Sequence, residues 1–295
     1  MTRVTRRGVL SASLAAALSA KTRVTKASER EIDPEFPPFE KKFMFAHEEI
    51  SHPVLYDGDG PGVILMHELP GMVPEFWRLA GWLREAGFTV YTPDLYADTL
   101  AAAPTPPSLR GNLYRVCMSR EIYVLSSHES SPVTVWLRAL ARHVKRKTDG
   151  AGIGVIGLCL TGNFALSLVI EEDVIAPVTA EPSLPLMFSG DAQAALHLSE
   201  DEREALRERT DIDIMALRFD GDPVCRKARF DSLEDLVGPE RLTRIELPDA
   251  AANPDGNPYP HAVLTRDLID EEGSLTLAAR DRVIAFLTDR LLPVR

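Results

Sequence analysis

The sequence has few cysteines and no long apolar run, and both absences exclude classes of protein. Its 295 residues include only three cysteines, Cys117, Cys159 and Cys225, which are too few for a disulfide framework. There is no Cys-x-x-Cys pair and no paired histidine spacing, so we expect no structural zinc and no cofactor. No apolar run approaches the ~18 residues of a spanning helix, so we expect no membrane span.

Basic residues are also in short supply. The chain has 33 Lys and Arg against 44 Asp and Glu, a net charge of −11. Nucleic-acid-binding proteins usually present clustered Lys and Arg, so this balance argues against a nucleic-acid partner. Apolar residues make up 45% of the sequence, which is enough for a sizeable core. The pattern gives no indication of a particular oligomeric state.

The first 30 residues differ from the rest of the chain. Arg6 and Arg7 open a basic, acid-free stretch that continues to Ala20 with small and mildly apolar residues. This pattern is typical of a twin-arginine export signal. A disordered basic leader on a cytoplasmic protein, or a start codon placed too early, is the alternative interpretation. We therefore expect residues 1–30 to be a leader and residues 31–295 to form a single domain.

Apolar runs and amphipathic segments alternate along that domain. Such alternation predicts an α/β fold with a mostly parallel, doubly wound sheet and helices on both faces. Residues 97–132 are less regular, and we expect a cap or loop over the site there, with a helix within 110–127. The predicted strands are 42–49, 52–56, 63–66, 88–91, 153–156, 176–180, 212–219 and 242–247. The predicted helices are 74–85, 134–147, 163–170, 226–237, 276–292 and one that begins at Ser199.

The segment 157–162, Gly-Leu-Cys-Leu-Thr-Gly, carries the most specific signal. It follows a predicted buried strand and precedes a predicted helix. A nucleophile between small residues at such a turn is the nucleophile-elbow pattern, with Cys159 in place of serine. The turn is tight, so its neighbours must lack bulk, and it directs the next amide towards a developing oxyanion. A buried cysteine that acts only as a small apolar side chain is the alternative.

Chain order favours the elbow interpretation. An α/β-hydrolase needs its nucleophile first, then its acid, then its histidine, and here Asp222 and His261 follow Cys159 in that order. Asp222 lies in a Gly-Asp-Pro turn, a common structural use of aspartate, and Asp220 is a competing acid. His261 follows a proline-containing loop at 253–260, and polar residues of loops often carry function.

With these residues in view, the chain resembles the dienelactone hydrolase family, a cysteine-nucleophile branch of the α/β-hydrolases. The resemblance runs from about Val63 to the C-terminal helix. It is sharpest at 63–71 (VILMHELPG), at 87–96 (GFTVYTPDLY), at the elbow and at the segments around Asp222 and His261. Together these segments are specific, although each alone is weak.

The resemblance implies a role for each matching residue. It makes Cys159 the nucleophile, His261 the base and Asp222 the acid. It further implies that Glu68 hydrogen-bonds the resting thiol and takes part in its activation. The oxyanion hole would be formed by the amides of Leu69 and Leu160.

Departures from the family pattern bear on the substrate. Thr161 stands where the family often has glycine. The dienelactone enzymes carry an arginine soon after the Asp-Leu-Tyr turn and another shortly after the histidine. Here Ala97 and Asp98 follow that turn, and Arg266 is the nearest basic residue after His261. We therefore expect a hydrolase of small esters or lactones, with a dienelactone in doubt. A non-catalytic member of the same fold, or a thiol-redox enzyme that pairs Cys159 with Cys225, remains the alternative.

Overall fold

The computed structural model describes residues 39–95, 131–184 and 193–292 of the chain. The expected leader at 1–30, the helix expected within 110–127 and nearly all of the expected cap at 97–132 lie outside these residues. Within them, no helix is long and apolar enough to cross a membrane.

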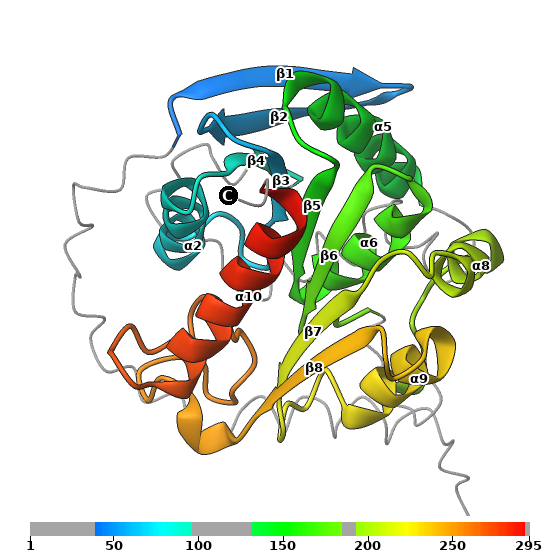
Figure 1. The fold of residues 1–295 in the computed structure, drawn as a ribbon. Coiled ribbons are helices and arrows are strands. Elements are labelled where there is room, and N and C mark those ends of the chain that lie inside the picture. Colours follow the sequence, from blue (N-terminus) through cyan, green and yellow to red (C-terminus); the bar gives the residue numbers. More distant parts are fainter. Residues whose placement is uncertain (1–38, 96–130, 185–192, 293–295) are drawn as a thin grey trace, which may run out of the picture. The chain divides into compact units, whose positions relative to one another are not determined.

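Eight strands form one sheet in the order β1-β2-β4-β3-β5-β6-β7-β8 (Figure 1). β1 and β2 pair antiparallel and β2 joins β4 antiparallel, whereas every later neighbour is parallel. The strands are β1 (Lys41–His47), β2 (Ile50–Asp57), β3 (Gly62–Met66), β4 (Thr89–Pro93), β5 (Ile153–Leu158), β6 (Val174–Ala180), β7 (Ile214–Phe219) and β8 (Leu242–Leu247). All eight predicted strands are therefore confirmed, with ends that differ by a few residues.

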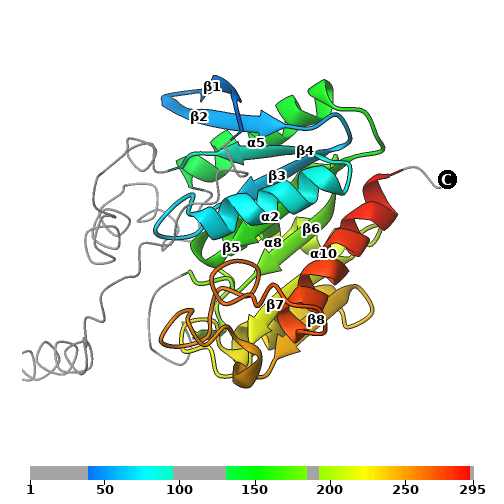
Figure 2. The same ribbon diagram turned by 90° about the vertical axis from the view of Figure 1, so that its left-hand side faces the viewer.

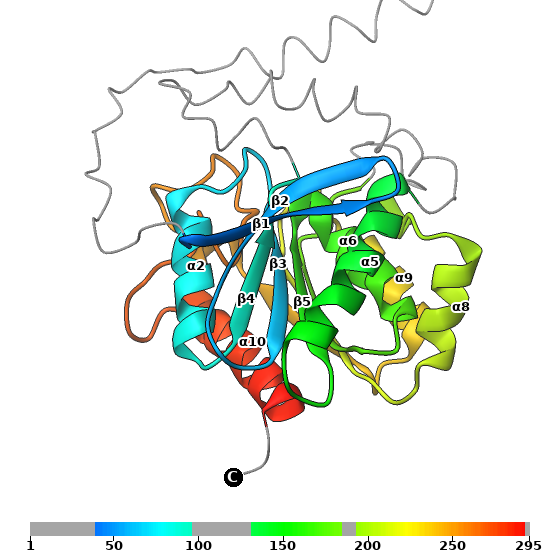
Figure 3. The same cartoon turned by 90° about the horizontal axis from the view of Figure 1, so that it is seen from above.

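The helices cover both faces of the sheet (Figures 1 and 3). α2 and α10 lie in front of the sheet in Figure 2, and Figure 3 shows α5, α6, α8 and α9 on its other side. The helices are α2 (Pro74–Glu85), α5 (Pro132–Lys147), α6 (Gly162–Ser167), α8 (Glu200–Glu208), α9 (Lys227–Val237) and α10 (Leu275–Leu291). The chain is thus an α/β protein with a doubly wound, mostly parallel sheet, as expected.

The two layers explain why the central strands are apolar throughout. Every residue of β3 and β5 is buried, because each strand is covered by helices on both faces. On the α2 side, Phe76, Leu79 and Leu83 of the helix are fully buried against the sheet. Each such side chain contributes about 1.5–3 kcal/mol through removal of apolar surface from water.

One predicted helix is shorter than expected. The stretch predicted at 163–170 forms α6 between two 3₁₀ turns, η1 (Cys159–Thr161) and η2 (Leu168–Ile170). The end of η2 is fixed by Arg209, whose guanidinium donates to the carbonyl oxygens of Val169 at 3.0 Å and Glu171 at 3.1 Å. These bonds satisfy carbonyl oxygens that the end of the helical segment leaves without an intrahelical partner.

The strand order changes direction at β3 and β5. β4 lies on one side of β3, while β5, β6, β7 and β8 follow one another on the other side. In doubly wound sheets, ligands bind outside the carboxyl ends of the strands at such a switch point. Glu68 and Cys159 follow those two strand ends directly, which directs attention to this edge of the sheet.

Candidate active site

Cys159 occupies a sharp turn between β5 and α6. Its φ angle is +53°, a left-handed conformation that a side chain of this kind rarely adopts. A Cβ atom on Gly157 would lie 2.1 Å from the carbonyl oxygen of Thr161, and one on Gly162 would lie 2.8 Å from the Cα of Pro182. Neither position has room for a side chain, as the elbow pattern requires. The turn therefore holds its thiol at the carboxyl end of β5 at a cost in backbone strain.

Thr161 does not merely crowd this turn. Its hydroxyl lies 3.0 Å from the carbonyl oxygen of Met66 and 2.9 Å from that of Leu158, and it accepts from the Leu158 amide at 2.9 Å. The side chain thus fills a fully buried position and links the elbow to the end of β3. A glycine here would lack this link.

His261 and Asp222 lie in direct contact. Nδ1 of the imidazole is 2.7 Å from Oδ2 of Asp222. The other carboxylate oxygen accepts from the amides of Val224 at 2.8 Å and Cys225 at 3.0 Å, which fixes its orientation. Asp220 instead points outward and is more than half exposed. Of the two candidate acids, Asp222 is the one beside the histidine.

The second nitrogen of His261 faces the elbow. The imidazole is close enough to Cys159 for the two side chains to interact, and Nε2 lies 3.5 Å from Oγ of Ser183. Burial by itself lowers the pKa of His261. Interactions with Cys159 and with Asp222 outweigh this effect and hold that pKa well above its usual range. These surroundings therefore favour the protonated form of the His261 imidazole.

The loop that carries His261 is held by one buried carboxylate. Oδ2 of Asp267 accepts from the amides of His261 and Ala262, each at 2.8 Å. Both of its oxygens also accept from Asn257, at 2.6 Å and 2.8 Å. Sequence reasoning gave no signal for this residue, because its partners are backbone amides of a loop whose path the sequence does not specify.

Glu68 is buried at the end of β3, close enough to His261 for the two charges to interact. Among the described residues its carboxyl hydrogen-bonds to Oγ1 of Thr265. Burial raises the pKa of Glu68, and the Thr265 hydrogen bond and the charge of His261 act in the opposite direction. The hydrogen bond from Glu68 to the thiol, expected from the resemblance, stays a prediction.

The residues expected to form the oxyanion hole flank the same edge. Leu160 follows Cys159 directly, and Leu69 lies in the loop after β3, the strand next to β5. The buried ring of His67 stabilises that loop through two hydrogen bonds to backbone groups. Its Nε2 accepts from the Leu95 amide at 3.2 Å, so Nδ1 donates to the carbonyl oxygen of Glu68 at 3.1 Å. Burial lowers the pKa of His67 to about 4, so it is neutral at physiological pH.

Glu181 is a site residue that sequence reasoning missed. It directly follows β6, is fully buried, and interacts electrostatically with His261, Glu68 and Cys159. A signal was present, because Glu181 follows a predicted strand just as Glu68 does. Applied to every strand end, the rule that selected Glu68 would have selected Glu181 as well.

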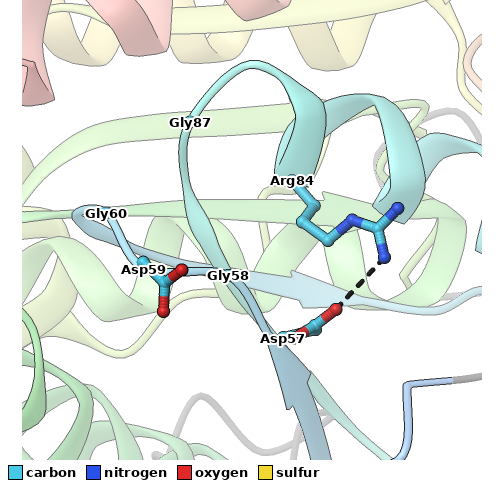
Figure 4. Close-up of a pocket in the computed structure, with 6 residues that line it drawn as sticks. All are labelled: Asp57, Gly58, Asp59, Gly60, Arg84 and Gly87. Atoms are coloured by element: carbon cyan, nitrogen blue, oxygen red, sulfur yellow. Dashed lines mark hydrogen bonds and ion pairs between the residues drawn. The ribbon is translucent and has the colours of Figure 1, made fainter.

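Other features of the described residues offer no competing site. Cys225 is fully buried, and burial raises the pKa of its thiol, which argues against a redox partner for Cys159. No group of His, Cys, Asp and Glu among the described residues could hold a metal ion. A hollow lies where the turns before β3 and β4 meet, at the opposite ends of these strands (Figure 4). Arg84, which lines this hollow, forms an ion pair with Asp57 at 3.1 Å.

Solved structures share this fold at low sequence identity. A dienelactone hydrolase from Anabaena variabilis is 15% identical with a TM-score of 0.53, and the match covers 86% of this chain and 99% of that one. A dienelactone hydrolase-like promiscuous phosphotriesterase from metagenomic libraries is 16% identical (TM-score 0.52; 84% and 97% covered). Est1E from Butyrivibrio proteoclasticus is 11% identical (TM-score 0.52; 84% and 98% covered). Among curated proteins, none matches this sequence.

A family model decides the relationship. The model described as "Dienelactone hydrolase family" matches residues 52–230, which is more than half of the chain. The match spans the elbow and Asp222, and it includes the strand ends that carry Glu68 and Glu181. The fold, the switch-point site and this match agree, and the chain belongs to the dienelactone hydrolase family, whose members are α/β-hydrolases.

Proposed function

We propose that this hydrolase cleaves small ester or lactone bonds through a covalent acyl-enzyme intermediate on Cys159. The observation that carries the proposal is the contact chain from thiol to imidazole to carboxylate. Cys159 interacts with His261, and Nδ1 of His261 lies 2.7 Å from Oδ2 of Asp222. A nucleophile, a base in hydrogen-bond reach and a group that orients the base are the parts that acyl transfer requires.

Acylation begins from the thiolate–imidazolium pair. The sulfur of Cys159 bonds to the substrate carbonyl carbon, and the carbonyl electron pair moves onto oxygen. We assign the amides of Leu69 and Leu160 to stabilise that oxyanion. The intermediate then collapses. The bond to the leaving oxygen breaks, and Nε2 of His261 gives that oxygen its proton, which leaves a thioester and a neutral imidazole.

Deacylation returns the enzyme to its starting state. The neutral imidazole of His261 takes a proton from water, and the resulting hydroxide adds to the thioester carbonyl. When this second intermediate collapses, the carbon–sulfur bond breaks, and the thiolate and imidazolium are restored. The net reaction consumes one water and yields a carboxylic acid and an alcohol, or a hydroxy acid from a lactone. Asp222 keeps Nδ1 protonated throughout and stabilises the imidazolium.

Glu68 has a supporting part in this proposal. Its carboxyl is buried and bound to Thr265, and we propose that it also hydrogen-bonds the sulfur of Cys159 before the substrate binds. Burial raises the pKa of Glu68, which favours a protonated carboxyl that can donate such a bond.

A small, uncharged substrate fits the described surroundings best. Dienelactone hydrolysis would need a cation for the substrate carboxylate. Among the described residues, Arg229 interacts electrostatically with Cys159 and Asp222, but its guanidinium donates to the carbonyl oxygens of Pro182 and Ala195. Since the guanidinium is occupied by these backbone carbonyls, we propose neutral short-chain esters and lactones as the substrate class.

The test is a substrate panel with two cysteine variants. Wild type should cleave p-nitrophenyl acetate and short-chain lactones. Cys159→Ala should lose at least about 10³-fold in kcat/KM while its thermal melt is preserved. Cys225→Ala is the matched thiol control and should keep its activity. Undiminished turnover by the Cys159 variant would remove the mechanism, and equal loss in both variants would favour the thiol-redox alternative.

A further inference from the structure

One buried acid takes no part in the mechanism above. Glu181 has none of its surface exposed, and its φ angle of +37° lies in the left-handed region. β6, whose end it follows, lies between β5, which leads to Cys159, and β7, which leads to Asp222. A buried carboxyl in a strained backbone conformation costs free energy, and such costs are concentrated at functional sites.

The side chain of Glu181 reaches the loop that carries the base. Its Oε2 accepts from the amide of Val263 at 3.3 Å, two residues beyond His261. Its own amide donates to the carbonyl oxygen of Leu217 on β7 at 2.7 Å. The residue therefore ties the His261 loop to the middle of the sheet. Its second carboxyl oxygen, Oε1, is buried without a hydrogen-bond partner among the described residues.

The next residues of the same turn reach both reacting groups. The amide of Ser183 donates to the carbonyl oxygen of Cys159 at 3.0 Å. The Ser183 hydroxyl donates to the carbonyl oxygen of Glu181 at 2.6 Å, so a lone pair remains for Nε2 of His261 at 3.5 Å. From below, Arg229 donates to the carbonyl oxygen of Pro182, the residue between them. We call residues 181–183 the β6 turn.

We propose that Glu181 is a positioning residue. It keeps His261 aligned with Cys159 through its hydrogen bond to the Val263 amide and through the β6 turn. The inference deepens the proposed function and rests on it. Glu181 touches the base loop rather than the reacting atoms, so its effect is transmitted through His261.

The surroundings of Glu181 determine its charge. Burial raises its pKa well above the usual range, and the positive charge of His261 opposes this shift. Glu68, Cys159 and Asp222, which face it from the neighbouring strand ends, raise the pKa further, because an ionised Glu181 would be repelled by negative charge on any of them. These shifts favour the protonated form of Glu181, in which the side chain is a neutral hydrogen-bonding group. A glutamine, which has the same shape and the same acceptor, should replace it.

Two substitutions separate this role from simple packing. Glu181→Met keeps the volume but removes the acceptor for Val263. It should lower kcat by about 10- to 100-fold, as expected when a reacting group is misplaced, with KM within about threefold of wild type. Glu181→Gln should keep kcat within about threefold. A Met variant with unchanged kcat, or a Gln variant as impaired as the Met variant, would overturn the proposal.

Alkylation of the thiol gives a readout that does not require hydrolysis. The rate of modification of Cys159 by iodoacetamide at pH 6.5, followed by mass spectrometry, reports the thiolate that an aligned His261 sustains. It should fall about tenfold in Glu181→Met and stay within about twofold of wild type in Glu181→Gln. If Glu181→Met and Glu181→Gln are alkylated at the same rate, Glu181 does not position His261. If Cys159→Ala still cleaves esters, the proposed function itself is wrong.

A matched control comes from another buried acid. Glu202 on α8 caps its helix and pairs with Arg138 of α5. Glu202→Met should lower the thermal stability but leave alkylation and kcat unchanged, and an equal loss there would assign both effects to general destabilisation. If Glu181→Met does not give a cooperative melt, Ser183→Ala carries the test. It should lower kcat about fivefold, and an unchanged kcat contradicts the role of the turn.

Discussion

Asp267 accepts hydrogen bonds from the backbone amides of His261 and Ala262 through a single carboxylate oxygen, each at 2.8 Å. The residue is fully buried, and its two bonds with Asn257 draw a second part of the loop to the same carboxylate. One side chain thus shapes the loop that presents the imidazole. The ring of His261 is aligned by Asp222, and its backbone is aligned by Asp267.

Removal of this carboxylate should therefore impair both folding and activity. In Asp267→Ala, four donors lose their acceptor, and each buried donor left unsatisfied costs about 1–3 kcal/mol. We expect a loss of at least about 3 kcal/mol in the free energy of unfolding in urea. In the folded fraction, kcat should fall by about 10²-fold. Wild-type stability would show that the loop holds its shape without Asp267.

Substitution of the acid should act on chemistry more than on stability. Asp222→Asn keeps the shape of the side chain but removes the charge that fixes the imidazole tautomer. We expect kcat for p-nitrophenyl acetate to fall by about 10³- to 10⁴-fold. The raised pKa of His261 should move down towards its ordinary value, because Asp222 contributes to the upward shift. An NMR titration of the ring measures this directly, and an unmoved pKa would reassign the acid.

The elbow should not tolerate a methyl group at Gly157. A Cβ there would lie 2.1 Å from a backbone oxygen of Thr161, so the turn itself must move. Gly157→Ala should lower the free energy of unfolding by at least about 2 kcal/mol and displace the thiol. Gly273→Ala is a useful control, because its φ is +87° but no atom lies within 4 Å of the added Cβ. The Gly273→Ala substitution should lower the free energy of unfolding by only about 1 kcal/mol. Equal losses in the two variants would refute the steric explanation.

The charge state of Glu181 predicts a pH dependence of stability. Its pKa is near 4.5 when unfolded and well above that value in the folded chain, so the folded state binds the proton more tightly. The contribution of Glu181 to the free energy of unfolding is fully present below about pH 4.5, and it is lost as the pH rises through the pKa of the folded state. Glu181→Gln cannot lose a proton. Its free energy of unfolding relative to wild type should therefore increase between pH 5 and pH 8, as measured in urea. A constant difference would show that Glu181 is ionised when folded.

Local sequence was enough to predict the elbow. Gly157 and Gly162 have no space for side chains because the turn is tight, and this requirement depends on a few neighbouring residues. The alternation of apolar runs and amphipathic segments likewise specified the strands and most helices, since burial on two faces leaves a continuous apolar pattern. The family resemblance narrowed this α/β prediction to the dienelactone hydrolase family, which the family match then confirmed.

The remaining site residues depend on contacts between distant segments. Val263 and Thr265 approach Glu181 and Glu68 only because the loop before α10 folds back over the strand ends. The sequence by itself determined where a nucleophile could be held, because a strained turn is a local property. Only the tertiary structure decided which acids surround the base, because the parallel sheet brings the carboxyl ends of separate strands to one edge.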